Sequence, residues 1–282
     1  MHTQRPPFHT NFISLISLII SLKTLNNKGE LSMDNRFLRN KDLIPQKLLD
    51  KISIIGLGGI GSFLVQGLAM MGWKEVHGYD SDIVEDHNLS TTCYPLNSNR
   101  IYKVVAGESL FNSYSDERQK FISYKQYGKM DKPTSKMVVC TDNMESRKMV
   151  YNDWKSLNEG FFIDLRMGAT SIELVTVTPN NDNYMDTWVP THTIPEAPCS
   201  QKHTVFATMH IVSLGLSQLY NLIANLAYYD YIWTSLSPNI VEFGTLITPN
   251  MNKEVSYDTG TRSINQLEGN AIRSNISYNR ST

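Results

Sequence analysis

A glycine-rich segment between a short apolar run and a helical run constrains this chain more than any other feature. It reads GLGGIG over residues 56–61, after KISII and before SFLVQGLAMMG. Glycines here permit a tight turn and let backbone N–H groups approach a phosphate, and the start of the following helix adds positive potential. Asp80 ends the next strand-like run, where its carboxylate can accept hydrogen bonds from ribose hydroxyls. The sequence therefore predicts a nucleotide site that includes Gly56, Gly58, Gly59 and Gly61.

The rest of the chain alternates short β-type runs with helical runs. FISYKQ, KMVVCTD, GFFIDLRMG and SIELVTVTP have the character of strands, and ESRKMVYNDWKSL that of a helix. Strands that alternate with helices form βαβ units, and runs that are apolar nearly throughout are typical of strands covered on both faces. We predict an α/β fold: a Rossmann-like, doubly wound, mainly parallel sheet with helices on both faces and a C-terminal extension.

The texture of the sequence divides the chain into four stretches. Residues 1–32 are expected to be a poorly ordered N-terminal extension, because FISLISLIISL is shorter than the roughly 20 residues of a spanning helix and no small-residue cleavage site follows. Residues 33–179 are predicted to form the ATP-binding domain. Residues 180–249 would complete it with a polar crossover loop, a long helix over His203 to Tyr229 and a terminal strand. Residues 250–282 form a polar tail rich in Ser and Asn.

Charge and cysteine content exclude several classes of partner. The formal net charge is −1, so no global basic field attracts nucleic acid or an anionic membrane. Cys93, Cys140 and Cys199 lie far apart and form no CxxC pair, which argues against a disulfide framework and a zinc site. We expect a cytosolic, cytoplasmic protein with no zinc, no membrane association and no nucleic-acid partner.

Three ordered motifs separate ATP from the dinucleotides. GxGGxGS over residues 56–62 is followed by D-x-D-x-V-x-x-x-N-L from Asp80, then a lysine, and D-N-x-x-x-R runs from Asp142 to Arg147. Together they resemble the pattern of the ThiF/MoeB/HesA family, which includes ubiquitin-activating enzymes. The resemblance covers roughly residues 35–226, and several motifs must coincide for it to be accidental.

The resemblance implies a site for ATP and Mg²⁺. Asp80 would hold the ribose, with Asp82 of the same motif also at the nucleotide, and Asn88 and Lys103 would contact the phosphates. Asp142 would bind Mg²⁺. ATP carries about four negative charges, so its site needs a cation, a metal carboxylate and backbone N–H groups together. The pairing of Lys103 with Asp142 therefore favours ATP over a dinucleotide.

The same resemblance implies an adenylyltransferase that activates a carboxylate as an acyl-adenylate. The substrate would be the C-terminus of a ubiquitin-like or sulfur-carrier protein, or of a peptide. Arg36 would reach a phosphate across the interface of a homodimer. Cys199 stands where some family members have a cysteine used in thioester or persulfide chemistry, and a thiol near a helix N-terminus ionises more easily. The alternative is an inert, half-buried cysteine.

Departures from the family pattern leave other functions open. Thr91 stands where the family normally has an arginine, so either catalysis is weaker or Arg100 or Arg166 supplies the charge. A structural ion pair is an equal interpretation of Arg166. The rival functions are an NAD- or FAD-dependent oxidoreductase on the same glycine loop and a degenerate nucleotide-binding scaffold. A third rival is a family member that adenylates a small molecule, a peptide amide or a modified nucleoside in RNA.

Overall fold

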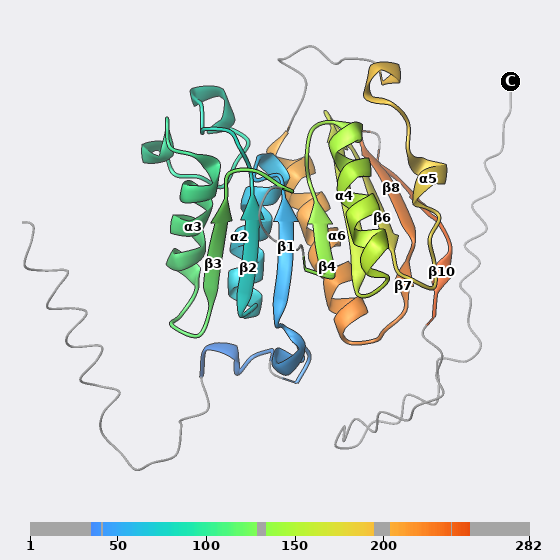
Figure 1. Ribbon diagram of the computed structural model, residues 1–282, viewed down its shortest axis with the longest axis horizontal. Coiled ribbons are helices and arrows are strands. Elements are labelled where there is room, and N and C mark those ends of the chain that lie inside the picture. Colours follow the sequence, from blue (N-terminus) through green and yellow to red (C-terminus); the bar gives the residue numbers. More distant parts are fainter. Residues whose placement is uncertain (1–34, 41, 129–133, 195–203, 238, 249–282) are drawn as a thin grey trace, which may run out of the picture. The chain divides into compact units, whose positions relative to one another are not determined.

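The computed structural model describes residues 35–40, 42–128, 134–194, 204–237 and 239–248 (Figure 1). One compact unit extends through Ile247 and a second begins at Thr248; every element below belongs to the first. The predicted extension over residues 1–32, the predicted tail over residues 250–282 and the candidate Cys199 lie outside the described residues.

An eight-stranded sheet forms the centre of this unit, in the order β3-β2-β1-β4-β5-β6-β8-β9. The first five strands in this order, from β3 through β2, β1 and β4 to β5, are parallel to one another. Strands β6, β8 and β9 continue the sheet in antiparallel pairs. The predicted α/β class with a mainly parallel sheet is confirmed. The strands are β1 Lys51–Ile55, β2 Glu75–Tyr79, β3 Lys120–Tyr124, β4 Lys136–Val139, β5 Phe161–Gly168, β6 Ser171–Val177, β8 Tyr231–Leu236 and β9 Asn239–Phe243, with a separate antiparallel pair of β7 Tyr228–Tyr229 and β10 Leu246–Ile247.

Helices cover both faces of the sheet (Figure 1). Helices α2, α3 and α6 contribute to one buried cluster, and α4 with the short α5 contributes to another. The helices are α2 Gly59–Met71, α3 Lys103–Tyr114, α4 Met144–Leu157, α5 Tyr184–Thr187 and α6 Val205–Ile223, and the 3₁₀ turns are η1 Asn35–Phe37, η2 Gln46–Leu48, η3 Asp86–Asn88, η4 Leu96–Ser98 and η5 Thr191–Thr193.

The central strands are mostly apolar because each of their faces meets one of these two clusters. In β1, Ile52 and Ile54 pack with the α2–α3–α6 cluster, whereas Ile55 packs with the α4 cluster. All three are at most 4% exposed. These strands therefore do not alternate polar with apolar residues. The lack of alternation is expected of a parallel sheet that is covered on both faces.

The long C-terminal helix is shorter than its sequence predicts. Helix α6 ends at Ile223, whereas the apolar run suggested a helix to Tyr229. Asn225 adopts a left-handed conformation with φ 54°, and the N–H of Leu226 donates to the Asn221 carbonyl at 2.8 Å, which is a typical helix ending. The tyrosines that follow form β7 instead and pair with β10.

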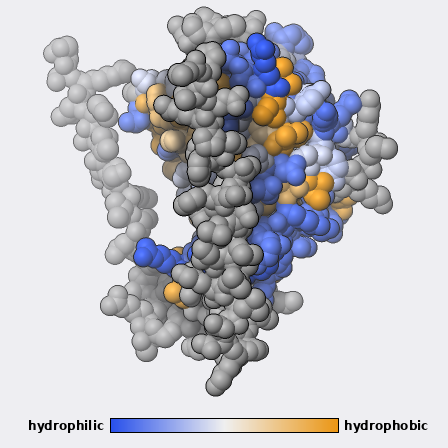
Figure 2. Space-filling view, turned by 90° about the vertical axis from the view of Figure 1, so that its left-hand side faces the viewer, coloured by the Kyte–Doolittle hydropathy of each residue, from blue (hydrophilic) through white to orange (hydrophobic). Residues whose placement is uncertain are grey.

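The polar crossover loop also differs from its prediction as irregular chain, because α5 and η5 lie within it. In the described part of the chain, no helix is both long and apolar enough to cross a bilayer. Figure 2 shows the side of the molecule on the left in Figure 1, which includes α3 and β3; hydrophobic groups there are interspersed with hydrophilic ones.

Candidate functional site

An open cleft of about 2620 Å³ runs along the carboxyl ends of the parallel strands. Three neighbouring strands end at this cleft, and the residue after each strand lines it: Gly56 after β1, Asp80 after β2 and Cys140 after β4. From β1 the chain adds β2 and β3 on one side, and it then returns to add β4 and β5 on the other side of β1. Open α/β sheets bind ligands at such a switch point in strand order. Of the residues predicted for the nucleotide, the cleft is lined by Gly56, Gly58, Gly59, Asp80, Asp82, Asn88, Lys103 and Asp142.

The glycines of the loop serve two different purposes. Gly56 has φ +93°, and an added Cβ would lie 2.8 Å from the backbone of Cys140. A Cβ on Gly61 would lie 2.0 Å from the Gly56 carbonyl oxygen, so these two glycines are required by packing within the chain. A Cβ on Gly58 would meet nothing within 4 Å. Gly58 thus leaves open space on the cleft side of the loop.

The start of α2 presents unsatisfied backbone donors to that space. Gly58 is the N-cap residue, no side chain caps the helix, and no acidic residue lies in its first turn. The first N–H groups of an α-helix have no intrahelical partner. An anion such as a phosphate therefore fits here, both by hydrogen bonding and by the positive potential of the helix start.

Asp80 and Lys103 form the charged wall beside the glycine loop. Asp80 accepts hydrogen bonds from the N–H groups of Leu57 at 2.7 Å and Asp82 at 2.9 Å. Lys103 opens α3, and its Nζ lies 2.8 Å from an Asp82 oxygen and 3.8 Å from an Asp80 oxygen. Burial raises the pKa of Asp80 above its ordinary value, although Lys103 and the two N–H donors oppose this. The two carboxylates thus hold the Lys103 ammonium beside the space in which a phosphate could bind.

Asn88 and Asp142 reach the cleft from different strand ends, Asn88 from η3 after β2 and Asp142 from the loop between β4 and α4. The Asn88 side chain accepts from the Glu85 N–H at 3.0 Å within a capping box, so its carboxamide oxygen has a structural role. Asp142 is exposed, and the next residue, Asn143, caps α4 by accepting from the Ser146 N–H at 2.7 Å. Helix capping thereby fixes the backbone on which Asp142 stands.

The acidic groups fit a metal ion that arrives with its nucleotide. Among the residues that the structure describes, no group of three or more His, Cys, Asp or Glu could hold a metal ion. Asp142 alone would supply one carboxylate. Mg²⁺ is typically held by one or two carboxylates together with waters and substrate phosphates, so this donor set suits MgATP. The expectation that the protein needs no zinc stays a prediction.

Arg36 lies away from the cleft, at the amino ends of the strands. Its guanidinium donates to Gln119 at 2.9 Å and to the Ala69 carbonyl at 3.1 Å, and also contacts Asp116 and the Tyr114 carbonyl. These partners lie at the ends of α2 and α3 and just before β3. Arg36 therefore ties the N-terminal turn to its own chain, and the structure does not bring it together with the other predicted site residues.

The cleft continues beyond the nucleotide residues over the antiparallel part of the sheet. Strand β5 extends past the end of β4, because Asp164 pairs with Val139, the last residue of β4, and β5 continues to Gly168. Arg166 thus stands at the cleft, directly opposite Glu173 of β6. Tyr231 and Trp233 of β8 line the same end.

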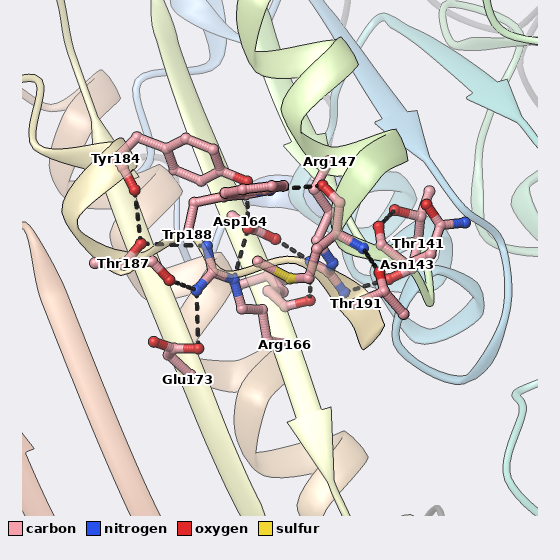
Figure 3. A network of polar contacts seen from close by, with 12 residues as sticks. Thr141, Asn143, Arg147, Asp164, Arg166, Glu173, Tyr184, Thr187, Trp188 and Thr191 are labelled. Carbon is pink, nitrogen blue, oxygen red and sulfur yellow. Dashed lines mark hydrogen bonds and ion pairs between the residues drawn. The ribbon is translucent and has the colours of Figure 1, made fainter. Parts of the chain in front are cut away.

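Arg166 is held by a dense set of polar contacts (Figure 3). Its Nε donates to Asp164 at 2.7 Å, and Nη1 donates to Glu173 at 3.0 Å and to the Thr187 carbonyl at 2.9 Å. Nη2 reaches the Thr187 hydroxyl at 3.2 Å. Burial alone would lower the pKa of this guanidinium, but Asp164 and Glu173 raise it. Both interpretations of Arg166 hold in part: it faces the cleft, and it forms a structural ion pair. Arg100 is exposed and does not line the cleft.

A second buried arginine shares the same carboxylate. Arg147 of α4 donates to Asp164 and to the Thr141 carbonyl, and its Nη1 donates to the Leu165 carbonyl at 3.0 Å. The Tyr184 hydroxyl donates to Asp164 at 2.9 Å. Asp164 is fully buried, and its charge is met by two guanidinium groups and a hydroxyl. This arrangement satisfies the requirement that buried charges be paired.

The start of α4 also holds the crossover segment, which we define as residues 184–194. The Thr191 N–H donates to Glu145 at 3.0 Å, its hydroxyl contacts the same carboxylate, and the Met144 N–H donates to the Thr191 hydroxyl at 2.8 Å. The Trp188 indole donates to the Met144 carbonyl at 2.8 Å. Hydrogen bonds from Thr191 lower the pKa of Glu145. The segment is thereby fixed beside the loop that carries Asp142.

The described cysteines are poor nucleophiles. Burial raises the pKa of the Cys140 thiol, and burial also raises that of Cys93, whose Sγ lies 3.1 Å from Gln66. Thiolates, not thiols, are the reactive species. The role of Cys199 stays a prediction, since that residue lies outside the described part of the chain.

Sequence reasoning missed the connection made by Asp164 and the contribution of Glu173 and Trp233. One signal was present: in IDLRMG, an acidic and a basic residue stand two apart in an otherwise apolar strand, so they share a face. The partners of that pair come from α4, β6 and the crossover segment, which no local pattern connects.

A family model described as the ThiF family matches residues 41–230. The comparison with curated proteins finds no match. Among solved structures, the fold is similar to that of PaaA, with a TM-score of 0.61 and 15% identity over 83% of this chain and 81% of that one. It is also similar to E. coli MccB in complex with ATP, with a TM-score of 0.58 and 14% identity over 84% of this chain and 79% of that one. E. coli MccB with MccA-N7isoASN gives 0.62 and 14%, over 86% and 82%.

Proposed function

The chain belongs to the ThiF family, and from this premise we propose that it is an ATP-dependent adenylyltransferase that activates a carboxylate as an acyl-adenylate. The observation that carries the proposal is the uncapped start of α2, with open space at Gly58, beside Asp80, Lys103 and Asp142. A dinucleotide site needs far less charge than a site for ATP, and this cleft combines free backbone donors, a lysine and a carboxylate.

In this proposal each residue has one task toward ATP. The N–H groups of the first turn of α2 bind phosphate oxygens, and Asp80 accepts from the ribose hydroxyls. Lys103 releases Asp82 and binds a phosphate. Asp142, together with phosphate oxygens, holds Mg²⁺, which neutralises charge on the leaving group. Support comes from the 2.8 Å contact of Lys103 with Asp82, which shows the ammonium within reach of the cleft.

The reaction itself needs positioning and electrostatics more than a strong base. A carboxylate oxygen of the substrate would form a bond to the α-phosphorus as the bond from that phosphorus to the β-bridging oxygen breaks. The products are an acyl-adenylate and pyrophosphate, whose negative charge Lys103 and the α2 start would meet. Thr91 supplies no positive charge where the family normally has an arginine, and the described structure offers Arg166 at the cleft, already paired.

We propose that the substrate is a polypeptide C-terminus, either of a ubiquitin-like or sulfur-carrier protein or of a peptide. E. coli MccB, which has a similar fold, has been solved with the peptide MccA. In this chain the cleft extends past the nucleotide residues to Glu173, Tyr231 and Trp233, which gives room for an extended chain. Two aromatic side chains, Tyr231 and Trp233, line this end and support a peptide rather than a compact small molecule.

The homodimer and the role of Cys199 belong to the same proposal, and both come from the family resemblance rather than from contacts of the described residues. A homodimer is expected because Arg36 has no obvious role within its own site. Its contacts with Gln119 and Ala69 lie away from the cleft, and the homodimer stays a prediction. Cys199→Ser should still exchange pyrophosphate with ATP and form no thiol-sensitive adduct with the activated substrate if the thiol is the acceptor. Retention of the full activity would make the cysteine structural.

The deciding experiment is ATP–pyrophosphate exchange in the presence of candidate peptides and carrier proteins with free C-termini. Exchange that depends on Mg²⁺ and disappears in Asp142→Ala, with the thermal unfolding of the variant unchanged, is the expected result. Thermal stabilisation by NAD(H) but not by MgATP would favour the oxidoreductase. Stabilisation by MgATP with no exchange on any carboxylate would identify a nucleotide-binding scaffold.

A further inference from the structure

The buried charges beneath the cleft have no task in the chemistry proposed above. Arg147, Asp164 and Arg166 lie together on the face of β5 that α4 covers, and Glu173 completes the set from β6 (Figure 3). Their side chains are 7%, 0% and 11% exposed for the first three, and 26% for Glu173. Two guanidinium groups balance two carboxylates, so the set contributes no net charge that could attract ATP.

The contacts of Arg147 point to the loop that carries Asp142. Arg147 extends from the first turns of α4 back to the Thr141 carbonyl, one residue before Asp142, and binds Leu165 and Asp164 of β5 with its other N–H groups. The loop between β4 and α4 is therefore fixed by a side chain that lines the same cleft as Asp142. A planar guanidinium can bind several acceptors in fixed directions, which a lysine cannot.

The contacts of Arg166 point to the other half of the cleft. Arg166 binds the carbonyl and hydroxyl of Thr187, in the crossover segment, at 2.9 and 3.2 Å, and shares Asp164 with Arg147. Tyr184 of the same segment donates to Asp164 at 2.9 Å. One carboxylate thus connects the loop of Asp142 to the segment beside the antiparallel strands.

We propose that Arg147 is a positioning residue for Asp142, and that Asp164 couples this loop to the crossover segment through Arg166. The metal role of Asp142 rests on the proposed function, whereas the coupling of the two segments does not. If Arg147 is displaced, Asp164 loses half of its compensation and Arg166 must readjust, which moves Thr187. A change at either end of the network is then felt at the other.

The first test measures amide hydrogen exchange without any nucleotide. Arg147→Lys keeps the charge but cannot hold Thr141, Leu165 and Asp164 together, so exchange at residues 141–146 should accelerate by about tenfold. Because of the coupling, exchange at residues 184–191 should accelerate as well. Arg166→Lys should produce the same two changes in the opposite order of size. Arg118→Lys, the same exchange of side chains in an exposed pair with Asp116, is the matched control.

The double variant Arg147→Lys/Arg166→Lys decides the coupling. Its effects on exchange should be clearly smaller than the sum of the single effects, as for residues of one network. Additive effects, or an Arg166→Lys variant with normal exchange at residues 141–146, would overturn the coupling. If an arginine variant does not fold, Thr187→Val removes a single acceptor of Arg166 and serves as the milder change at that end.

The second test separates positioning from a merely structural role. The ratio of ATP affinities with Mg²⁺ and with EDTA, measured by calorimetry, should fall by about tenfold in Arg147→Lys, as outer-shell changes typically reduce metal affinity. Adenosine affinity should not change. An unchanged ratio would refute the positioning role of Arg147. If the wild-type protein shows no Mg²⁺-dependent ATP binding, the proposed function is wrong, and the exchange data still decide the coupling.

Discussion

The two halves of the cleft are built on different principles. The nucleotide half, at the ends of β1, β2 and β4, includes the start of α2, whose backbone N–H groups no side chain of the described structure caps. The other half, on β5, β6 and β8, presents side chains that already satisfy one another, as Arg166 does with Asp164 and Glu173. The first half keeps binding capacity for a ligand, whereas the second is fixed before any ligand arrives.

Substitutions of glycines and substitutions of charged side chains should therefore act in different halves of the cleft. Among the ordinary substitutions only proline removes a backbone N–H, so side-chain changes reach the nucleotide half mainly through the glycines that shape it. The antiparallel half is vulnerable through single charged atoms, because removing one partner of a buried pair leaves the other uncompensated.

Substitution of Gly61 should have the largest effect. Its new Cβ would lie 2.0 Å from the Gly56 carbonyl oxygen, a backbone atom that cannot move away. We expect Gly61→Ala to lower the free energy of unfolding by about 3 kcal/mol, measured by urea denaturation. Gly58→Ala is the matched control: its Cβ enters open space, and the loss should be about 1 kcal/mol. ATP affinity, however, should fall in Gly58→Ala. Equal destabilisation by the two would contradict the division between packing and ligand-facing glycines.

Removal of the Lys103 ammonium should come next. Lys103→Met leaves Asp80 and Asp82 uncompensated beside the phosphate site, so ATP binding should weaken by about 2 kcal/mol, roughly thirtyfold, whereas adenosine binding changes little. Calorimetric titration of both ligands measures this. Lys74→Met, at an exposed lysine at the amino end of β2, is the control. Unchanged ATP affinity would mean that the phosphates lie elsewhere.

A smaller effect is expected at Glu173, in the antiparallel half. Glu173→Gln removes one of the two carboxylates that pair with Arg166. The Glu173 side chain is only partly buried, with 26% of it exposed. We expect a loss of about 1 kcal/mol in the unfolding free energy and a several-fold change in the KM for the polypeptide. The change in ATP affinity should be well below that of Lys103→Met, because Glu173 reaches the Asp142 loop only through Arg166 and Asp164. A shift in ATP affinity as large as that of Lys103→Met would erase the distinction between the two halves.

The smallest effect concerns Glu75, at the amino ends of the strands and far from the cleft. Burial would raise its pKa, but Lys120, His77 and Lys51 together hold it at about 2. Because the folded pKa lies below the ordinary 4.5, the stabilisation is complete above pH 4.5 and is lost as the pH falls toward 2. With solvent screening we expect about 0.5 kcal/mol. Acid unfolding of wild type should therefore be steeper in this range than that of Glu75→Gln, and parallel curves would refute the assignment.

Much of the fold and of the nucleotide half was predictable from the sequence. The turn after β1 needs glycine for reasons that are local: φ +93° at Gly56 and the close approach of Gly61 to it. Asp80 directly follows β2 and Asp142 lies three residues after the end of β4, so parallel strand order brings them to one edge. Local geometry and sheet topology together place these residues, and both can be inferred from a periodic pattern.

The antiparallel half and the N-terminal arginine were not predictable in the same way. Asp164 obtains its partners from α4 and α5, which lie 17 and 20 residues away in the chain. The contacts of Arg36 join it to residues 33 to 83 positions away. The end of α6 was missed because Tyr228 and Tyr229 suit a helix or a strand, and their pairing with β10 decides between them. Such tertiary contacts override local propensity.

The overhang of β5 beyond β4 has a consequence for how this protein could change length. Gly168 pairs with Ser171 at the tip of the β5–β6 hairpin, and Ser171 pairs in turn with Ser235 of β8, so the overhang belongs to a ribbon of β5, β6 and β8. Side chains alternate between faces along a strand, so a one-residue deletion would turn Arg166 and Glu173 away from the cleft. A paired deletion of two residues in each strand would keep their orientation and shorten the ribbon by one repeat. Evolution or engineering can therefore vary the reach of this wall only in steps of two.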